Sequence, residues 1–312
     1  MKSERNWGRL GMKSNWMTTT INDVCSLVTD GAHNSPKSVE KGRYMASVKD
    51  FTEFGFDFSN CRRISEEDYE RLRKQGCVPE KDDILVGKDG ARYFEDIVIY
   101  KQDEQPALLS SIAILRADRK KIIPEFLYYT LKTPAVKKNV RDNYGSGSAI
   151  PRIVLKDFKR MPFSFPSVDE QRKITAICSA IDSKIQVNNA INKNLSDLLQ
   201  AIYQKQFGEV SLGANQGILS DICSYSKEKV AVSELNVNTY FSTENMLPEK
   251  AGSTKATSLP TTLQTTACRK GDTLISNIRP YFKKIVYCED KCGCSTDVLC
   301  FTPSQPCYSA YL

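Results

Sequence analysis

The sequence has no long hydrophobic run. No stretch of its 312 residues approaches the roughly 18 apolar residues that a membrane-spanning helix needs. Residues 1–20 mix lysine, arginine and polar residues, without an apolar stretch of signal-peptide length. We therefore expect a cytoplasmic protein with no membrane partner. The 40% apolar and 26% charged content is typical of a soluble chain that is long enough for two domains.

Several catalytic motifs are also missing. The chain contains no G-x-x-x-x-G-K-[ST] segment to cradle nucleotide phosphates, which argues against an ATPase. It contains no glycine-rich turn suited to S-adenosylmethionine and no Asn/Asp-Pro-Pro-aromatic segment, which argues against a methyltransferase. The missing motifs therefore argue against these two activities.

The eleven cysteines include no C-x-x-C pair. Their odd number and the expected reducing compartment favour free thiols over a disulfide framework. Four thiolates could surround zinc, and five cysteines gather near the C-terminal end, at positions 288, 292, 294, 300 and 307. Three of these alternate with apolar residues like buried strand positions, so we expect small buried hydrophobes and no metal site.

The chain repeats itself in its second half. Residues 22–26 (NDVCS) return as 220–224 (SDICS), and 80–86 (EKDDILV) return as 269–275 (RKGDTLI). In the same order, residues 99–100 pair with 286–287, residues 110–115 pair with 295–300, and the last two residues fall on 126–127. Solenoid repeats are at most about 50 residues long, so this spacing indicates a duplicated domain. Residues 128–207 have no second copy.

One long helix is predicted over residues 167–207. The segment has no glycine or proline, Pro166 precedes it, and Gly208 follows it. Ser167 and Glu170 form a capping-box pattern. At 1.5 Å per residue the helix is roughly 60 Å long, too long to lie across one small domain. Its apolar residues recur at helical spacing on one face, with Asn188 at a seam position, and the seam comprises Ile174, Ile177, Ile181, Asn188, Ile191, Leu195, Leu198 and Ile202.

Three segments carry a family resemblance. Residues 145–153 (GSGSAIPRI), 161–166 (MPFSFP) and 170–174 (EQRKI) resemble the junction between a target-recognition domain and its spacer helix in specificity (S) subunits of type I restriction-modification systems. Residues 30–36 (DGAHNSP) are similar to a turn near the start of such domains. The likeness spans the whole chain in architecture and is most specific at the Pro, Glu-Gln, Ile run that enters the helix.

This resemblance implies an α+β fold, a role in DNA recognition, and a chain that is not an enzyme and binds no cofactor of its own. The family's S subunits hold two target-recognition domains apart with two antiparallel helices, and each domain reads one half of a split double-stranded DNA target. The same helices dock methyltransferase (modification) subunits, which carry S-adenosylmethionine. ATP and magnesium belong to partner subunits, and a separate motor/nuclease (restriction) subunit cuts the DNA. We expect an N-terminal extension (1–16), a first recognition domain (17–165), a spacer/coiled-coil helix (166–208) and an incomplete second recognition domain (209–312). The unpaired helix predicts an antiparallel homodimer.

Candidate DNA contacts lie on turns and loops. Residues 88–93 follow an apolar strand-like run, so we expect Lys88 and Arg92 to point outward. A cation and an aromatic recur in the matching stretch, residues 277–284. Base edges and phosphates need directed donors and cations, and the full set of candidates is His33, Asn34, Lys88, Arg92, Tyr93, Ser146, Ser148, Arg152, Arg279 and Lys283. His33 could instead hold its turn together, and residues 145–149 could be a flexible exit from the domain.

Two other functions stay open. Asp272 followed by Glu289, Asp290 and Lys291 has the form of a magnesium-dependent nuclease site, although the first copy does not reproduce the lysine. A helical scaffold that binds no DNA would also use the long helix. The net charge of +7 is compatible with nucleic acid and does not prove it.

Overall fold

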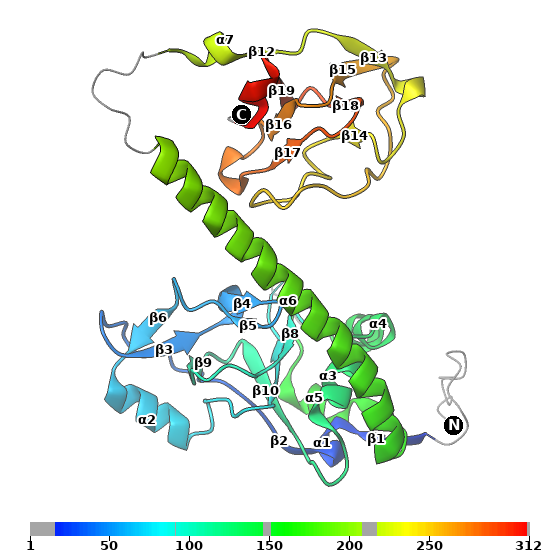
Figure 1. Ribbon diagram of the computed structural model, residues 1–312. Helices are drawn as coiled ribbons and strands as arrows, with labels where there is room; N and C mark the ends of the chain where they lie inside the picture. The colour runs from blue at the N-terminus through cyan, green and yellow to red at the C-terminus, as the bar shows by residue number, and fades with distance from the viewer. Residues whose placement is uncertain (1–15, 91, 146–150, 208–216, 311–312) are drawn as a thin grey trace. The chain divides into compact units, whose positions relative to one another are not determined.

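The computed structural model describes residues 16–90, 92–145, 151–207 and 217–310. The chain forms two compact units, Met1–Ala201 and Ile202–Leu312. Each unit mixes strands with helices, which confirms the predicted α+β class (Figure 1). No described helix combines the length and the hydrophobicity that crossing a bilayer requires.

The first unit is built on a four-stranded antiparallel sheet. Its strands lie in the order β2 (Cys25–Asp30), β10 (Ile112–Ala117), β7 (Ile84–Gly87) and β8 (Ile97–Ile99). A second sheet has the order β6 (Arg62–Ile64), β3 (Arg43–Ala46) and β9 (Ala107–Leu108), and two pairs join β1 (Met17–Thr20) to β11 (Pro162–Phe165) and β4 (Phe51–Thr52) to β5 (Gly55–Phe56). The short helices are α1 (Ile21–Val24), α2 (Glu66–Lys74), α3 (Pro124–Lys132), α4 (Pro134–Asn143) and α5 (Leu155–Arg160).

Both faces of the four-stranded sheet are buried. Ile84 and Val86 belong to a core cluster that contains Phe126 and Leu127 of α3, whereas Leu85 belongs to the cluster on the opposite face. Alternate residues of a strand point to opposite faces, so a strand covered on both sides reads as a continuous apolar run. This explains the run of residues 84–86, and it fixes where β7 ends and the following turn begins.

The second unit repeats this sheet. Its strands lie in the matching order β12 (Cys223–Tyr225), β19 (Val298–Pro303), β16 (Thr273–Ser276) and β17 (Ile285–Tyr287), and α7 (Leu219–Ile222) precedes β12 as α1 precedes β2. A further sheet has the order β13 (Lys229–Ala231), β15 (Gln264–Cys268), β18 (Cys292–Cys294) and β14 (Tyr240–Phe241). The shared strand order confirms the duplication that the sequence indicates.

A buried aspartate recurs at the same place in both copies. Asp83 Oδ2 accepts a hydrogen bond from the Glu80 amide at 2.8 Å, and Asp272 Oδ2 accepts one from the Arg269 amide at 2.8 Å. Each aspartate comes directly before the central strand of its sheet, β7 or β16. The same carboxylate therefore closes the same turn in both units, and the match of residues 80–86 with 269–275 is confirmed.

Two of the other sequence matches are wrong by one residue. Ile84 faces Ile99 across β7 and β8, while its counterpart Thr273 faces Tyr287, so Ile99 corresponds to Tyr287 and not to residue 286. In β10 and β19, Ile112 corresponds to Val298 and not to residue 297. Runs of similar apolar residues look alike when shifted, and only the strand register distinguishes them. The proposed match of the last two residues lies outside the described part.

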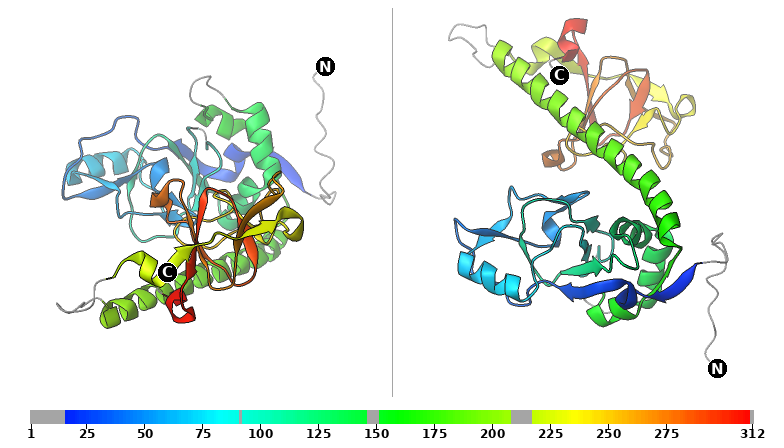
Figure 2. Two further views of the ribbon diagram at one scale, coloured as in Figure 1. Left: turned by 90° about the horizontal axis from the view of Figure 1, so that it is seen from above. Right: turned by 60° about the horizontal axis from the view of Figure 1, so that its bottom comes forward.

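Helix α6 (Val168–Phe207) is one unbroken helix of 40 residues, which confirms the predicted element (Figure 2). Its first turns are bonded to the first unit through Gln171, whose side chain is fully buried. Gln171 Oε1 accepts from the Ile123 amide at 2.9 Å, and its Nε2 donates to the Pro166 carbonyl at 3.0 Å. Farther along, the Tyr129 hydroxyl donates to Asp182 Oδ2 at 2.9 Å. The half of the capping box that joins the Glu170 amide to Ser167 Oγ is present at 3.5 Å.

We expect Gln171→Leu to lower the free energy of unfolding of the first unit by about 3 kcal/mol, because it leaves buried backbone groups without hydrogen-bond partners. Chemical denaturation measures the change. Gln186→Leu, at an exposed position of the same helix, is the matched control and should have little effect. Equal stabilities of the two variants would contradict the role given to Gln171.

Candidate nucleic-acid interface

The turn after β2 presents His33 to solvent. Its side chain is 74% exposed, and Nε2 lies 3.2 Å from Oδ1 of the buried Asp30. Gly31 is required because a Cβ there would lie 2.3 Å from the Leu108 carbonyl oxygen. The Ala32 amide donates to the same carbonyl at 2.7 Å. The turn is thus fixed by its backbone, and Asp30 orients the exposed imidazole.

Lys88 does not point outward, so that expectation is wrong. Its side chain is only 10% exposed, and Nζ lies 3.4 Å from Asp30 Oδ2 and 3.7 Å from Asp89 Oδ1. The charge is buried because β2 and β7 bring Asp30 within reach, although the two residues are far apart in the sequence. Lys88 therefore supports the His33 turn from beneath, and a direct contact between Lys88 and DNA stays a prediction.

The turn between β7 and β8 exposes Arg92. Phe94 adopts a positive φ of 62° and is buried in the core, and its amide donates to the Gly87 carbonyl at 2.6 Å. The buried ring anchors the turn, and Arg92, two residues before it, faces solvent. Arg92 Nη2 donates to Asp96 Oδ1 at 2.7 Å, and this hydrogen bond raises the pKa of Arg92. Tyr93 beside it is half-buried.

The flanks of the glycine-serine loop lie against this same turn. The Gly90 amide donates to the Pro151 carbonyl at 2.9 Å, and Asp89 pairs with Arg152 in an isolated β-bridge. A Cβ on Gly145 would lie 2.5 Å from the Tyr93 hydroxyl oxygen. The two sequence-predicted segments therefore form one surface. Ser146 and Ser148 lie outside the described residues.

The described candidates of the first unit thus belong to one loop cluster. Arg92 and Arg152 lie on adjoining backbone segments, and the Asp30–Lys88 pair connects them to the turn that carries His33 and the exposed Asn34. Asp30 and Asp89, which hold the cluster together, were missed by the sequence analysis. Asp30 could have been noticed, because it opens the turn motif that contains His33.

The second unit has a corresponding turn between β16 and β17. Arg279 and Lys283 are both exposed there. Lys283 Nζ donates to Glu249 Oε2 at 2.9 Å. Because the sheets have the same strand order, this turn and the one that carries Arg92 occupy equivalent positions in their units.

The structure argues against a nuclease site that includes Asp272. Asp272 is buried, and its carboxylate accepts hydrogen bonds from the Arg269 amide and, at 3.3 Å, from Cys300 Sγ. Lys291 Nζ pairs with Glu234 at 3.0 Å. Within the described ranges, no group of three His, Cys, Asp or Glu residues has metal-binding geometry.

The described cysteine side chains are all free thiols. Five of those in the second unit are buried in one core cluster, as small hydrophobes would be: Cys268, Cys288, Cys292, Cys294 and Cys300. Cys288 Sγ lies 3.5 Å from Cys292 Sγ. Hydrogen bonding with Cys268 and Cys288 lowers the pKa of the Cys292 thiol, against the effect of burial. The side chain of Cys307 lies outside the described part.

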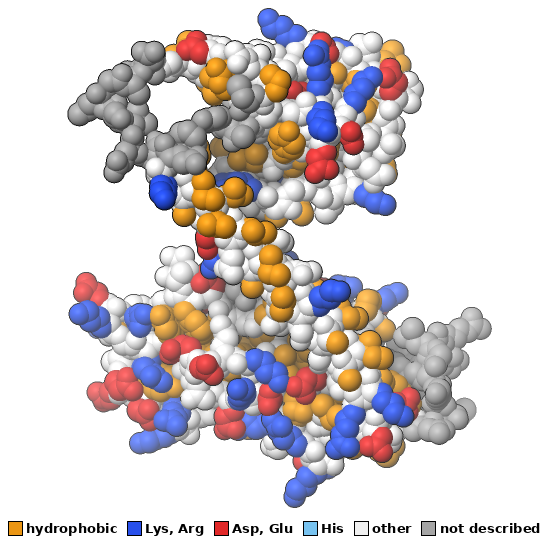
Figure 3. Space-filling model, viewed as in Figure 1, with side chains coloured by type: hydrophobic (Ala, Val, Ile, Leu, Met, Phe, Trp, Pro, Cys, Tyr) orange, Lys and Arg blue, Asp and Glu red, His pale blue; other side chains and the backbone are white. Residues whose placement is uncertain are grey.

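The predicted helix seam is largely uncovered. Ile174 packs against the core of the first unit, whereas the remaining seam residues are exposed, and every described side chain from 183 to 205 is exposed. Figure 3 shows hydrophobic side chains at the surface along the length of α6. Val187, Leu199 and Tyr203 are also exposed and widen the apolar face beyond the predicted seam.

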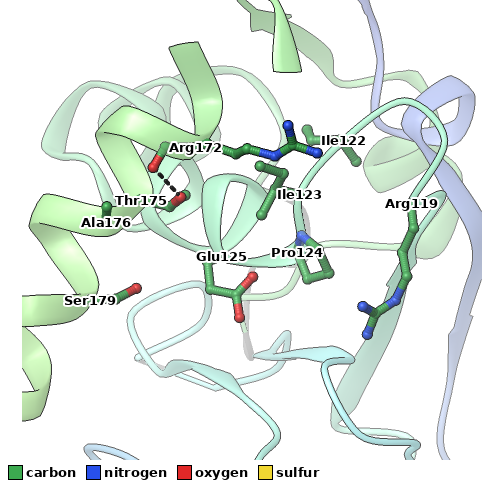
Figure 4. Close-up of a pocket in the computed structure, with 9 residues that line it drawn as sticks. All are labelled: Arg119, Ile122, Ile123, Pro124, Glu125, Arg172, Thr175, Ala176 and Ser179. Carbon is green, nitrogen blue, oxygen red and sulfur yellow. Dashed lines mark hydrogen bonds between the residues drawn. The ribbon is translucent and has the colours of Figure 1, made fainter. Parts of the chain in front are cut away.

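A shallow pocket lies where α6 meets the start of α3 (Figure 4). Arg119 and Arg172 flank the apolar residues Ile122 and Ile123 and the first residue of α3, Pro124. Both guanidinium groups have carboxylate partners, because Arg119 pairs with Asp82 and Arg172 with Asp169. We assign no ligand to this pocket.

Comparison with known proteins gives a consistent result. A sequence model described as "Type I restriction modification DNA specificity domain" matches residues 13–197. The chain is 27% identical over 208 residues to the type I restriction enzyme EcoBI specificity subunit of Escherichia coli, covering 63% of this chain and 42% of that protein. It is 26% identical over 114 residues to the HindI specificity subunit of Haemophilus influenzae, covering 35% and 24%. The matches therefore span less than half the length of these two relatives.

A solved structure shares the fold. The S subunit of a type I restriction-modification system from M. genitalium aligns with a TM-score of 0.52 at 17% identity, covering 97% of this chain and 79% of that chain. At this identity the likeness concerns the arrangement of helices and strands alone.

We expect Lys88→Met to lower the free energy of unfolding by about 3 kcal/mol, because it leaves the buried Asp30 carboxylate without its cation. Lys81→Met, at an exposed position, is the matched control and should be nearly neutral. Adding Asp30→Asn to Lys88→Met should recover part of the loss, which a double-mutant cycle measures. Strictly additive effects would show that the two side chains do not interact.

Proposed function

Because this chain belongs to the family of type I restriction modification DNA specificity domains, we propose that it recognises a specific double-stranded DNA sequence as the specificity subunit of a type I restriction-modification complex. The observation that carries the proposal is the loop cluster of the first unit. It presents a histidine, two arginines and an asparagine from turns that buried residues hold in place. Donors of this kind on a rigid scaffold suit base edges and phosphates.

The repeated sheet supports recognition of a two-part target. Each unit carries an exposed basic turn at the same place in the same strand order. Two related readers on one chain suit two DNA half-sites. We propose that each unit reads one half of a bipartite sequence and that α6 sets the gap between the halves.

We propose that the chemistry lies on partner subunits. The buried carboxylate of Asp272 and the paired Lys291 offer no hydrolytic centre. Methylation with S-adenosylmethionine would come from modification subunits, and cleavage with ATP and magnesium from a motor/nuclease subunit. The specificity subunit would recognise the target sequence on the DNA and provide a docking surface.

The exposed apolar face of α6 is the proposed docking surface. Several isoleucine and leucine side chains in succession are about half exposed along it. An apolar stripe of this length is stabilised in water by a second helix. We propose that a second copy of this chain supplies an antiparallel helix, with Asn188 setting the register, and that methyltransferase subunits dock on the resulting pair.

DNA binding is tested by titrating the chain with duplexes of random sequence at rising salt. A DNA-recognition subunit should bind with a clear negative salt dependence, because it displaces counterions from phosphates. If Arg92 contacts a phosphate, Arg92→Gln should reduce the slope of log affinity against log salt by about 1. Arg73→Gln removes an exposed arginine of α2 and is the matched control. A response that does not vary with salt would instead favour a scaffold that binds no DNA.

Self-association is tested by sedimentation velocity at tens of micromolar chain. Replacing both Ile181 and Leu195 by Asp should abolish the dimer, because charges would lie in the apolar seam. Replacing Gln186 and Ala190 by Asp places the same charges on the opposite side of α6, and this double variant should still dimerise. A wild-type chain that remains monomeric would rule out the homodimer.

A further inference from the structure

The turn between β16 and β17 has an unusual backbone. Arg279 and Lys283, on either side of the 3-10 turn Pro280–Phe282, have positive φ angles of 51° and 50°. The facing loop contributes two more non-glycine residues of this kind, Glu249 at 54° and Lys250 at 59°. Residues other than glycine rarely adopt this backbone conformation, and it persists only where surrounding contacts hold it.

Contacts between the two loops hold this conformation. The Glu249 amide donates to the Phe282 carbonyl at 2.8 Å, and the Lys250 amide donates to the Lys283 carbonyl at 2.9 Å. Two lysines add side-chain bonds: Lys283 Nζ donates to Glu249 Oε2 at 2.9 Å, and Lys284 Nζ donates to the Thr243 carbonyl at 2.6 Å. Both lysines thus anchor the turn, and Lys283 has a structural task in addition to the DNA contact predicted for it.

Between these anchors the turn presents two side chains of a different kind. Tyr281 is 68% exposed, and its ring rests against that of Phe282 with centroids 4.7 Å apart. Arg279 is exposed, and among the described residues its guanidinium has no hydrogen-bond or ion-pair partner. A rigid loop therefore presents an aromatic ring and an unpaired cation two residues apart.

A polar pocket adjoins the base of the turn. Thr243, Ser295 and Asp297 are among its lining residues. Thr243 Oγ1 lies 3.1 Å from Ser276 Oγ, and the Asp297 carbonyl accepts from the Asn277 amide at 2.9 Å, so the pocket and the turn share a border. The Ser295 hydroxyl is buried without a hydrogen-bond partner in the part of the chain that the structure describes. The exposed carboxylate of Asp297 can accept hydrogen bonds from the amino groups of cytosine or adenine.

We propose that this turn is the DNA-contacting element of the second unit: Arg279 binds a base edge or phosphate, and Tyr281 stacks against a base step as a wedge. The inference rests on the proposed function and deepens it by naming the residues of the second unit that meet the DNA. Arginine provides paired donors for guanine, and an aromatic ring can stack on any base. The loop is already ordered, so little conformational freedom is lost when it binds.

The test uses the full chain and the duplexes that the wild type selects from a random-sequence pool, with 2-aminopurine placed at successive positions. Tyr281→Ala should weaken binding roughly tenfold and remove the fluorescence rise that marks an unstacked base, because the base loses the aromatic ring on which it stacks. Tyr281→Phe should retain both. Arg279→Gln should also weaken binding about tenfold. Tyr287→Ala, at a half-exposed tyrosine on β17, is the matched control and should bind as the wild type does.

The outcomes separate this inference from the function on which it rests. Wild-type affinity and fluorescence in both Tyr281→Ala and Arg279→Gln would overturn the role of the turn. If Arg92→Gln still weakened binding, DNA recognition by the first unit would stand. A wild-type chain that selects no duplex would overturn the proposed function itself. Circular dichroism establishes that each variant is folded, and Tyr281→Phe keeps the ring where Tyr281→Ala does not.

Discussion

The buried amide of Gln171 joins the long helix to the domain that it leaves. It bonds the Ile123 amide at the start of α3 and the Pro166 carbonyl just before α6. Beyond the contact of Tyr129 with Asp182, every described side chain from 183 to 205 is exposed. A helix exposed on all sides draws little stability from packing. The first turns of α6 therefore fix the direction in which its apolar face points. The proposed spacing of two DNA half-sites depends on these first turns.

The sequence predicts elements better than it predicts contacts. The 3.6-residue period predicts α6 almost to the residue, because that signal extends over about eleven turns. The repeated strand order was also predictable, since the matched segments occur in sequence order. The exact counterparts of Ile99 and Ile112 in the second unit were not predictable, because neighbouring residues in an apolar strand resemble one another. Lys88 shows the same limit for charge: its partner Asp30 is brought to it only by the pairing of β10 with both β2 and β7.

The duplicated sheet separates structural residues from candidate functional ones. Asp83 and Asp272 make the same bond to a backbone amide three residues earlier, so both are explained by the turn that they close. The sequence pattern that placed Asp272 in a metal site did not take into account that Asp83, its counterpart in the first unit, closes the same turn. A residue retained in both copies with the same buried contacts serves the fold that the copies share.

The turns that follow β7 and β16 differ in how they are anchored and in which side chains they expose. In the first unit, buried Phe94 anchors the turn, and Arg92 is exposed beside an aspartate. In the second, two lysines anchor it, and Arg279 and Tyr281 are exposed. The framework strands hold both turns at equivalent positions, so their residues can change without disturbing the sheet. The two units thus share a scaffold and differ in the tips that it holds, which is the arrangement expected of the two half-site readers proposed here. The turn of the second unit and the loop that faces it hold four positive-φ residues, one of them an arginine that has no partner among the described residues, and strain of this kind is typical of functional sites.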